Sequence, residues 1–336
     1  MSPTPLVIVG PTASGKTALA VALALAARAR GHEAEIISAD AMAIYRGMDI
    51  GTAKPAPAER AAVVHHLVDV AEPTEDYTVS RFAADAGAAL ADVESRGVVP
   101  IIVGGTGLYV RALVDGFTIP ARFPDVLAEL EAEPDTESLH RRLVLLDPVG
   151  AAKMLPGNRR RIVRALEVTL GSGRPFSSFG PGVDHYPPTR FRQIGLEIDR
   201  TLLDARIDAR YDRQLAEGFL AEVRALQTLG LSRTAAQALG YRELLAHLHG
   251  QATIDEALDL ARRRTRRLAR RQQRWFRRDP RIEWFDAAAT DLVHHVEEHW
   301  FGADTENRGD TESRVDIDNP ADTGNCVGGC GPELRD

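Results

Sequence analysis

The sequence predicts an α/β protein with a parallel β-sheet that is covered by helices on both faces. Short apolar runs alternate with Ala-rich helical stretches over residues 1–115, and such alternation is typical of parallel sheets. We expect strands at Leu6–Val9, Ala34–Ser38, Val98–Val103 and, more briefly, His66–Val70. Further along the chain, Phe191–Ile198 and Arg281–Phe285 have the alternation and length of two more strands.

The first strand leads directly into a glycine-rich loop, and a helix is expected to follow from Ala18 to Arg30. Glycines let backbone N–H groups surround an anion, and the helix adds the positive end of its dipole. Lys16 supplies a charge, and the hydroxyl of Thr17 is a ligand for Mg²⁺. The order strand, loop, helix therefore predicts a P-loop NTPase-like parallel sheet core that binds a polyphosphate. The loop residues are Gly10, Pro11, Thr12, Ala13, Ser14, Gly15, Lys16 and Thr17.

The chain is expected to divide into four parts. Residues 1–118 form the first part of the P-loop core. Residues 119–198, interrupted by prolines, form a helical insertion, and residues 199–302 return to the core with C-terminal helices. Residues 303–336 are acidic and polar and are expected to be a disordered tail. The expected helices after residue 119 are Val126–Ala132, Thr136–Leu146, Thr201–Gln214, Glu217–Leu229 and Ile254–Arg278.

Charge is distributed very unevenly along the chain. The formal net charge is −7, but residues 303–336 hold nine acids and three arginines, which leaves about −1 for the rest. Residues 262–278 hold ten arginines and no acid. An average near neutrality therefore hides a strongly basic helix.

Composition also excludes several classes of protein. No apolar run is long enough to span a membrane. Because the first strand is expected only a few residues from the start, we expect no secretory signal. The two cysteines, Cys326 and Cys330, both lie in the tail, which excludes a disulfide framework and fits a cytoplasmic location. Because no second pair of ligands lies nearby, we interpret these cysteines as an incidental pair and not as a metal site.

Two further loops follow strands and are expected to face the same crevice as the phosphate loop. Asp40 either holds Mg²⁺ through water or accepts a proton, or else it caps the segment that follows. In Gly104-Gly105-Thr106-Gly107 the glycines either let the backbone approach a ligand or form a tight strand–helix turn. Nucleotide hydrolases usually carry a magnesium-binding Asp at this place, so the glycine there argues against hydrolysis.

The arginines of the basic helix recur at helical spacing. Like charges so placed repel each other and weaken an isolated helix. The stripe is therefore a solvated face, is partly paired with Asp255, Glu256 or Asp259, or meets a polyanion such as phosphates. We expect Trp275 and Phe276, at its end, to belong to the core. Arg262, Arg266, Arg270 and Arg274 are four residues apart, and Arg263, Arg267, Arg271 and Arg278 lie on an adjoining face.

Together these motifs resemble the tRNA dimethylallyltransferase family, also called tRNA isopentenyltransferases, over about residues 5–300. The resemblance implies that the exocyclic N6 amine of the adenosine just 3′ of the anticodon attacks C1 of dimethylallyl diphosphate, and pyrophosphate leaves. The phosphate loop would then hold a prenyl diphosphate and not ATP. The matching segments are Gly10–Thr17, Ser38–Asp40, Ile44–Pro55, His66–Asp69, Gly104–Tyr109, Arg161–Val168, Gly240–Leu244 and Thr265–Arg278.

The resemblance also implies roles for single residues. Asp40 would be the general base, Thr106 would lie at the reacting centre, and Arg210 would grip the leaving pyrophosphate. Lys16 and Thr17 would bind the diphosphate and Mg²⁺. Further implications are a monomer and tRNA contacts through Asp40, Ala41, Met42, Ala43, Thr106, Leu127, Arg160, Arg161, Ile162, Val163 and Arg164.

Two of these tRNA-contact positions depart from the pattern of the family. Leu127 stands where relatives often carry arginine, which puts that contact in doubt. Arg160 stands where glutamine is frequent, so it keeps polarity and adds a charge. Without the resemblance, the basic cluster Asn158–Arg164 indicates only the start of a basic surface helix.

Three other functions compete with this interpretation. A P-loop kinase for a small molecule shares the phosphate loop and an acid near the second strand, but it needs no arginine-rich helix. A prenyltransferase for free adenine nucleotide (adenylate isopentenyltransferase) also needs no extended basic surface. A nucleic-acid-binding module with a non-functional loop would not need Lys16, Thr17 and Asp40 intact.

Overall fold

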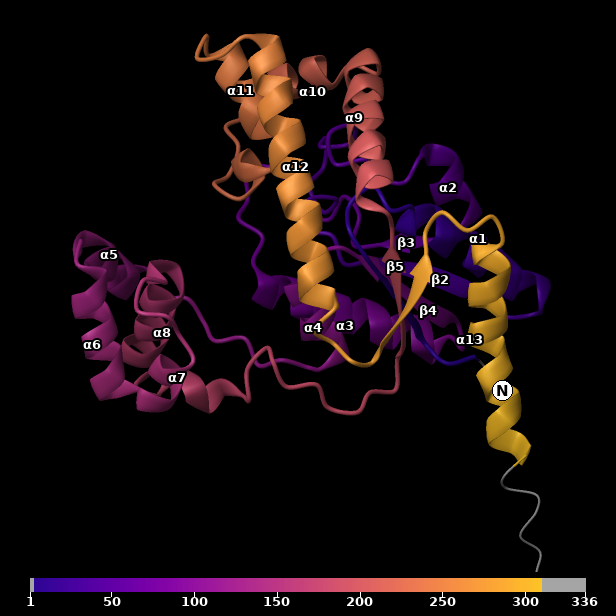
Figure 1. The fold of residues 1–336 in the computed structure, drawn as a ribbon, viewed down its shortest axis with the longest axis horizontal. Helices are drawn as coiled ribbons and strands as arrows, with labels where there is room; N and C mark the ends of the chain where they lie inside the picture. The colour runs from indigo at the N-terminus through magenta and orange to yellow at the C-terminus, as the bar shows by residue number, and fades with distance from the viewer. Residues whose placement is uncertain (1–2, 310–336) are drawn as a thin grey trace, which may run out of the picture.

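The computed structural model describes residues 3–309, and side chains up to residue 302. In this part of the chain a six-stranded, fully parallel sheet has the order β3-β2-β4-β1-β5-β6 (Figure 1). The order confirms the predicted α/β class, with the phosphate-loop strand β1 next to the centre. The strands are β1 (Leu6–Val9), β2 (Ala34–Ser38), β3 (His65–His66), β4 (Val99–Gly104), β5 (Arg192–Glu197) and β6 (Ile282–Asp286).

Helices cover both faces of the sheet. Leu6 and Ile8 of β1 pack with α1 and α13, whereas Val7 and Val9 point to the opposite face, because successive side chains of a strand alternate. That opposite face is covered by α3, α4 and the helices α9 to α12. The core helices are α1 (Lys16–Ala29), α2 (Pro57–Ala62), α3 (Val79–Ser95), α4 (Gly107–Val114), α9 (Arg200–Ala216), α10 (Phe219–Gln227), α11 (Tyr241–Leu248), α12 (Ile254–Phe276) and α13 (Leu292–Gly309), with a short 3-10 turn η2 (Ala235–Gln237).

The insertion has a small hydrophobic core of its own and stands to one side of the sheet (Figure 1). Two connecting segments, residues 115–123 and 180–191, join it to the rest of the chain. The predicted boundary at residue 198 is too late, because β5 pairs with β1 and so belongs to the core sheet. The insertion consists of α5 (Pro124–Ala132), α6 (Thr136–Leu146), α7 (Pro148–Ala152), α8 (Arg159–Ser172) and the 3-10 turn η1 (Phe176–Phe179).

Some predicted elements end elsewhere. The strand expected at His66–Val70 is reduced to His65–His66, because Leu67 and Asp69 have positive φ angles of 61° and 58° that break the extended backbone. The long basic helix ends at Phe276. Helix α13 continues to Gly309, so the expected disorder does not begin at residue 303. The rest of the predicted tail, with both cysteines, lies outside the described residues.

Candidate active site

The phosphate loop connects β1 to α1 in a conformation that depends on glycine. Gly10 has a φ of 150°, and a Cβ there would lie 2.9 Å from the carbonyl oxygen of Leu196 in β5. Gly15, the residue before α1, has a φ of 94°. Ala13 also has a positive φ, at 64°, which an L-residue adopts only when its surroundings hold it there. The loop therefore curls tightly around the N-terminus of α1, as an anion site requires.

Three cations converge on this loop. Lys16 Nζ donates to the Pro11 carbonyl at 2.6 Å. Arg210 on α9 donates to Thr12 Oγ1 at 2.9 Å and to the Gly51 carbonyl at 3.1 Å. Arg206, one helical turn earlier, donates to the Ser14 carbonyl at 3.5 Å. The sequence prediction included Lys16 and Arg210 but missed Arg206, although the spacing of four residues on one helix places both arginines on one face.

None of these three cations has a carboxylate partner among the described residues. In addition, the buried Nε of Arg210 and the buried hydroxyl of Ser14 have no hydrogen-bond partner within residues 3–309. Buried charges are normally paired, and buried polar atoms normally form hydrogen bonds. The loop therefore offers unused donors and positive charge to an anion.

Burial lowers the pKa of Lys16 from its usual value to about 8, while Asp40 acts against this and Arg210 adds to it. Lys16 therefore loses its charge as the pH rises through about 8, so the Kd for inorganic pyrophosphate, a probe of the anion site, should increase above that pH. Calorimetric titration at about pH 7 and about pH 9.5 measures the difference. A Lys16→Arg variant stays charged at both pH values and should show little of this loss of affinity. An equal loss of affinity in both proteins would show that the charge of Lys16 is not its cause.

Asp40 and Thr106 lie next to each other at the carboxyl edge of the sheet. One oxygen of Asp40, Oδ1, accepts hydrogen bonds from the backbone N–H groups of Met42 at 2.8 Å and Ala43 at 3.2 Å. Thr106 Oγ1 accepts one from the N–H of Ala41 at 3.2 Å. Asp40 therefore does cap the following turn, which was one of the two alternatives, and its second oxygen has no hydrogen bond among the described residues. Such a carboxylate is oriented and still able to accept a proton.

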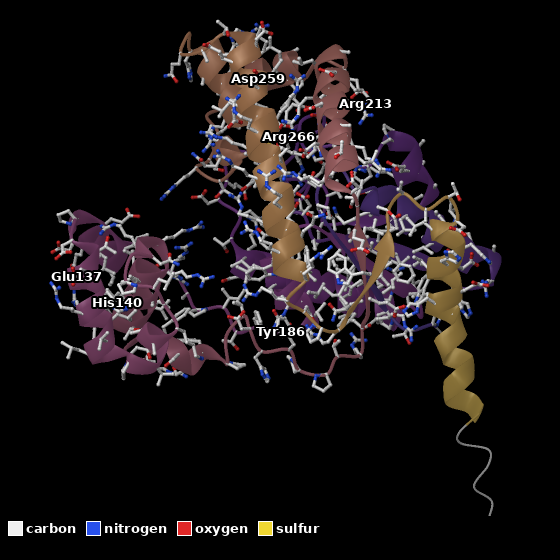
Figure 2. The ribbon with its side chains drawn as sticks, viewed as in Figure 1. Glu137, His140, Tyr186, Arg213, Asp259 and Arg266 are labelled. Carbon is white, nitrogen blue, oxygen red and sulfur yellow. The ribbon has the colours of Figure 1, made fainter. Side chains whose placement is uncertain are left out.

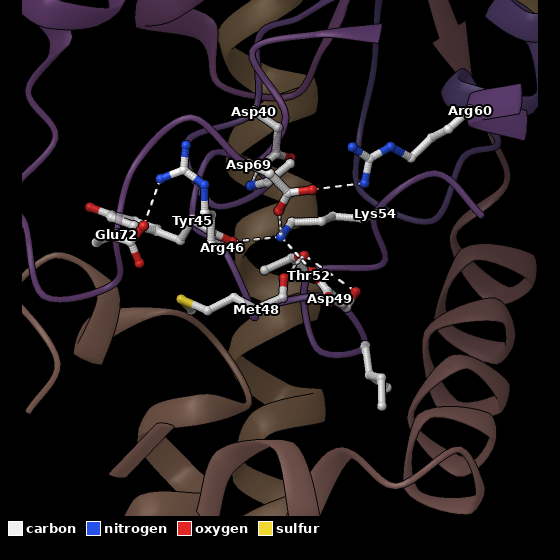
Figure 3. Close-up of polar contacts among 12 residues, drawn as sticks. Asp40, Tyr45, Arg46, Met48, Asp49, Thr52, Lys54, Arg60, Asp69 and Glu72 are labelled. Atoms are coloured by element: carbon white, nitrogen blue, oxygen red, sulfur yellow. Dashed lines mark hydrogen bonds and ion pairs between the residues drawn. The ribbon is translucent and has the colours of Figure 1, made fainter. Parts of the chain in front are cut away.

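The segment Ile44–Pro55 follows Asp40 in the chain and is held by a network of polar contacts (Figure 3). Its centre is Lys54, whose side chain is 3% exposed and whose Nζ contacts Asp49, Asp69 and the Tyr45 carbonyl at 2.5–2.6 Å. Arg60 forms a second ion pair with Asp69 at 2.7 Å. These bonds join the turn after β2 to the turn after β3. The contacts within this long motif therefore hold the loop between Asp40 and Gly51 in place.

Glu222 of α10 holds the other end of this loop and was not foreseen. Its carboxylate accepts three consecutive backbone N–H groups, those of Asp49, Ile50 and Gly51, at 2.8–3.2 Å. It also accepts the hydroxyl of Tyr241 at 2.6 Å. Because the carbonyl of Gly51 in turn accepts from Arg210, Glu222 positions part of the cation cluster. A glutamate on an amphipathic helix gives no such signal in the sequence.

The arginine-rich helix α12 uses part of its charge internally. Arg262 and Arg266 pair with carboxylates of α9, with closest approaches of 2.5 Å to Asp212 and Asp208. Figure 2 labels Arg266 on α12. Of the three expected partners within the helix, only Asp259 approaches an arginine, at 3.7 Å from Arg262. Phe276 is buried and Trp275 half-buried, which confirms their place in the core. The remaining exposed arginines, here called the α12 arginine face, are Arg263, Arg267, Arg271 and Arg274, and none of them forms an ion pair within the described residues.

The structure does not bring the insertion residues to the phosphate loop. Arg160 and Arg161 are exposed at the start of α8, whereas Ile162 and Val163 are buried in the core of the insertion, so their side chains are not available to a ligand. Arg164 is half-buried, with Glu167 at 2.8 Å, and donates to the Pro120 carbonyl. Leu127 packs against the same core, which explains an apolar residue at that position.

Fold and site together define a phosphate-loop α/β protein with an anion site beside an oriented carboxylate. A family model described as IPP transferase matches residues 43–279. A tRNA dimethylallyltransferase from Kineococcus radiotolerans is 54% identical over 290 residues, which cover 84% of this chain and 91% of that relative. The chain belongs to the tRNA dimethylallyltransferase (IPP transferase) family of prenyl-transferring enzymes.

Three further relatives agree with this assignment. A tRNA dimethylallyltransferase from Thermobifida fusca is 49% identical over 296 residues, which cover 86% of this chain and 92% of that one. The crystal structure of a tRNA isopentenylpyrophosphate transferase from Bacillus halodurans aligns with a TM-score of 0.66 and 35% identity, covering 93% of this chain and 99% of that chain. A eukaryotic dimethylallyltransferase acting on tRNA aligns with a TM-score of 0.74 and 25% identity, over 91% and 80% of the two chains. Within residues 3–309, no helix has the length and apolar character that crossing a membrane requires.

Proposed function

We propose that this protein transfers the dimethylallyl group of dimethylallyl diphosphate to N6 of the adenosine 3′-adjacent to the anticodon of tRNA. Family membership supports the class of reaction. The observation that carries the proposal is the cluster of Lys16, Arg206 and Arg210, which has no carboxylate partner within the described residues and lies beside Asp40. One site thus contains cations that can bind an anion and a carboxylate that can accept a proton.

The geometry supports a direct displacement. The N6 lone pair forms a bond to C1 of the prenyl group while the bond from C1 to the diphosphate oxygen breaks, and pyrophosphate leaves. The unpaired oxygen of Asp40 accepts the N6 proton, while the N–H groups of Met42 and Ala43 hold the other oxygen still. Lys16, Arg206 and Arg210 stabilise the charge that builds up on the leaving group. Fixed charges aimed at a developing anion are usually the largest contribution to catalysis.

The residues present fit Mg²⁺ as a cofactor shared with the substrate. The Thr17 hydroxyl and the Asp40 carboxylate are hard oxygen donors, which Mg²⁺ prefers. The described residues contain no cluster of three or more His, Cys, Asp or Glu that would form a cage of its own for the metal. Mg²⁺ is commonly bound by one or two protein oxygens together with substrate phosphates, and Thr17 would hold it in this way. When bound, it would neutralise charge on the diphosphate.

The tRNA is proposed to lie along the α12 arginine face and the exposed Arg160 and Arg161 of the insertion, where Leu127 also lies. Near the reacting centre it would contact Ala41, Met42 and Ala43 beside Asp40. Because a base stacked between its neighbours cannot enter an active site, the target adenosine must leave its stack to reach Asp40 and Thr106. A monomer acting in the cytoplasm completes the proposal.

Incubation of the purified protein and Mg²⁺ with labelled dimethylallyl diphosphate and tRNA, AMP or ATP in parallel tests the proposal. Label is expected in tRNA only, at the anticodon loop. Label in AMP or ATP with none in tRNA would instead indicate a prenyltransferase for free nucleotides. Turnover of ATP with a small acceptor, and no labelled tRNA, would indicate a kinase.

Affinity for tRNA is expected to fall steeply with salt, because phosphate contacts release counterions. Replacing Arg267, Arg271 and Arg274 by Ala should weaken tRNA binding and make the slope of log Kd against log salt shallower by about 2–3. Fluorescence anisotropy with an anticodon stem-loop measures both. The matched control is Arg28→Ala on α1, on the opposite face of the sheet. Salt-independent binding, or an unchanged slope in the triple variant, would contradict the role of the α12 arginine face.

A further inference from the structure

Gln272 connects the arginine-rich helix to both loops of the candidate site. Its side-chain Oε1 accepts the backbone N–H of Thr12, in the phosphate loop, at 2.8 Å. Its Nε2 donates to the carbonyl of Gly105, next to Thr106, at 2.9 Å. Gln272 thus uses both ends of one amide, and its two partners lie 260 and 167 residues away in the sequence.

The glycines of the Gly104–Gly107 loop are explained by the close packing of helix α12 against this loop. None of Gly104, Gly105 and Gly107 has a positive φ angle, so a turn conformation does not require them. A Cβ at Gly105 would overlap Nε2 of Gln272, and a Cβ at Gly107 would overlap the ring of Trp275. A Cβ at Gly104 would overlap the Ala39 carbonyl. Instead of making room for a ligand, Gly105 and Gly107 make room for α12.

The contacts of Gln272 lie where the two substrates of the proposed reaction would meet. Thr12 also accepts Arg210 through its hydroxyl, so its backbone and side chain are held from two helices. Gly105 precedes Thr106, whose hydroxyl accepts the N–H of Ala41 beside Asp40. The amide of Gln272 therefore fixes the distance between the diphosphate end of the site and the end that holds the acceptor.

We propose that Gln272 is a positioning residue, whose amide keeps the phosphate loop and the Asp40–Thr106 loop in register and links both to the helix that binds tRNA. This inference rests on the proposed prenyl transfer. It separates catalysis from binding, because a displacement requires aligned reactants, and a misplacement of about 1 Å can cost about 100-fold in rate. Binding of either substrate alone needs no such alignment.

Gln272→Ala and the isosteric Gln272→Glu test the inference. The glutamate still accepts from Thr12 but cannot donate to Gly105, so both variants should lower kcat by about 10- to 100-fold. In Gln272→Ala, which adds no charge beside the phosphate loop, the KM for tRNA and the calorimetric Kd for pyrophosphate should stay within about threefold of the unmodified protein, as an unaltered binding energy requires. The control is Gln273→Ala, the next residue of α12, whose side chain has no hydrogen bond in the described structure. It should leave kcat unchanged.

A double-mutant cycle with Gly105→Ala identifies the contact itself. Alone, Gly105→Ala displaces the amide of Gln272 with its new methyl group and should lower kcat about as much as Gln272→Ala. Combined with Gln272→Ala it should cause no further loss, because the overlapping group is gone. Losses that multiply in the double variant, or an unchanged kcat in Gln272→Glu, would overturn the inference. An unmodified protein that fails to prenylate tRNA would overturn the proposed function instead.

Discussion

Replacing Asp40 by Asn is expected to lower kcat for prenyl transfer by about 10²- to 10⁴-fold, the range that a positioned general base supplies. The asparagine oxygen can still accept the N–H groups of Met42 and Ala43, so the turn that Asp40 caps should remain folded. What is lost is the ability to take up the N6 proton. Single-turnover rates with enzyme in excess over labelled tRNA measure the chemical step directly.

Binding is the control for this substitution. The Kd for tRNA should stay close to that of the unmodified protein, because Asp40→Asn alters neither the α12 arginine face nor the insertion. Asp40→Ala should lose the rate as well and, in addition, the hydrogen bonds to Met42 and Ala43, which we expect to lower the Tm. Weakened tRNA binding combined with normal turnover of bound tRNA would show that Asp40 is not the base.

Replacing Arg210 by Ala is expected to lower kcat/KM by about 10²- to 10³-fold, as for the loss of one donor to a developing anion. Pyrophosphate should also become a weaker product inhibitor, because Arg210 belongs to the cluster that holds it. The buried Nε of Arg210 has no partner among the described residues, and burial holds the pKa of this guanidinium below its usual range. Arg210→Ala also loses the hydrogen bonds to Thr12 and Gly51, so the Tm of the variant is measured to confirm that it is folded at the assay temperature.

The matched control for Arg210 is Arg213→Ala. Arg213 lies on the same helix, α9, but its side chain is 65% exposed and its carboxylate partner is Glu217 at 3.7 Å (Figure 2). Exposed pairs of this kind contribute little, so kcat/KM and pyrophosphate inhibition should be unchanged. Equal losses of kcat/KM in the two variants would mean that α9 acts through its overall charge and that Arg210 does not bind the leaving group specifically.

The sequence led to the central strands and the phosphate loop because both depend on local pattern. A run of four buried apolar residues followed by glycines and Lys16 specifies strand, loop and helix within about 25 residues of chain. Asp40 could be predicted because the end of a parallel strand fixes which edge of the sheet it occupies. The long motif Ile44–Pro55 pointed to the family, but its physical role as a brace around Lys54 was not visible in the sequence.

The arginine run shows what the sequence pattern could not predict. Helical spacing predicted the stripe, but it did not tell which arginines are neutralised. Carboxylates of α9 take up Arg262 and Arg266 and leave the α12 arginine face exposed. In the same way, the five consecutive tRNA-contact positions Arg160–Arg164 in α8 could not be told apart in the sequence, but packing buries Ile162 and Val163 inside the insertion.

The sequence by itself determined the α/β class, the anion-binding loop, the acid at the second strand and the family, since each is written in residues close together along the chain. Only the tertiary structure decided that Arg206 joins Arg210 at the phosphate loop, that Glu222 holds Gly51, and that Gln272 joins two loops. The physical reason is distance along the chain. A side chain on a helix has a direction that periodicity reveals, but its partner is chosen by how the helices pack on the sheet.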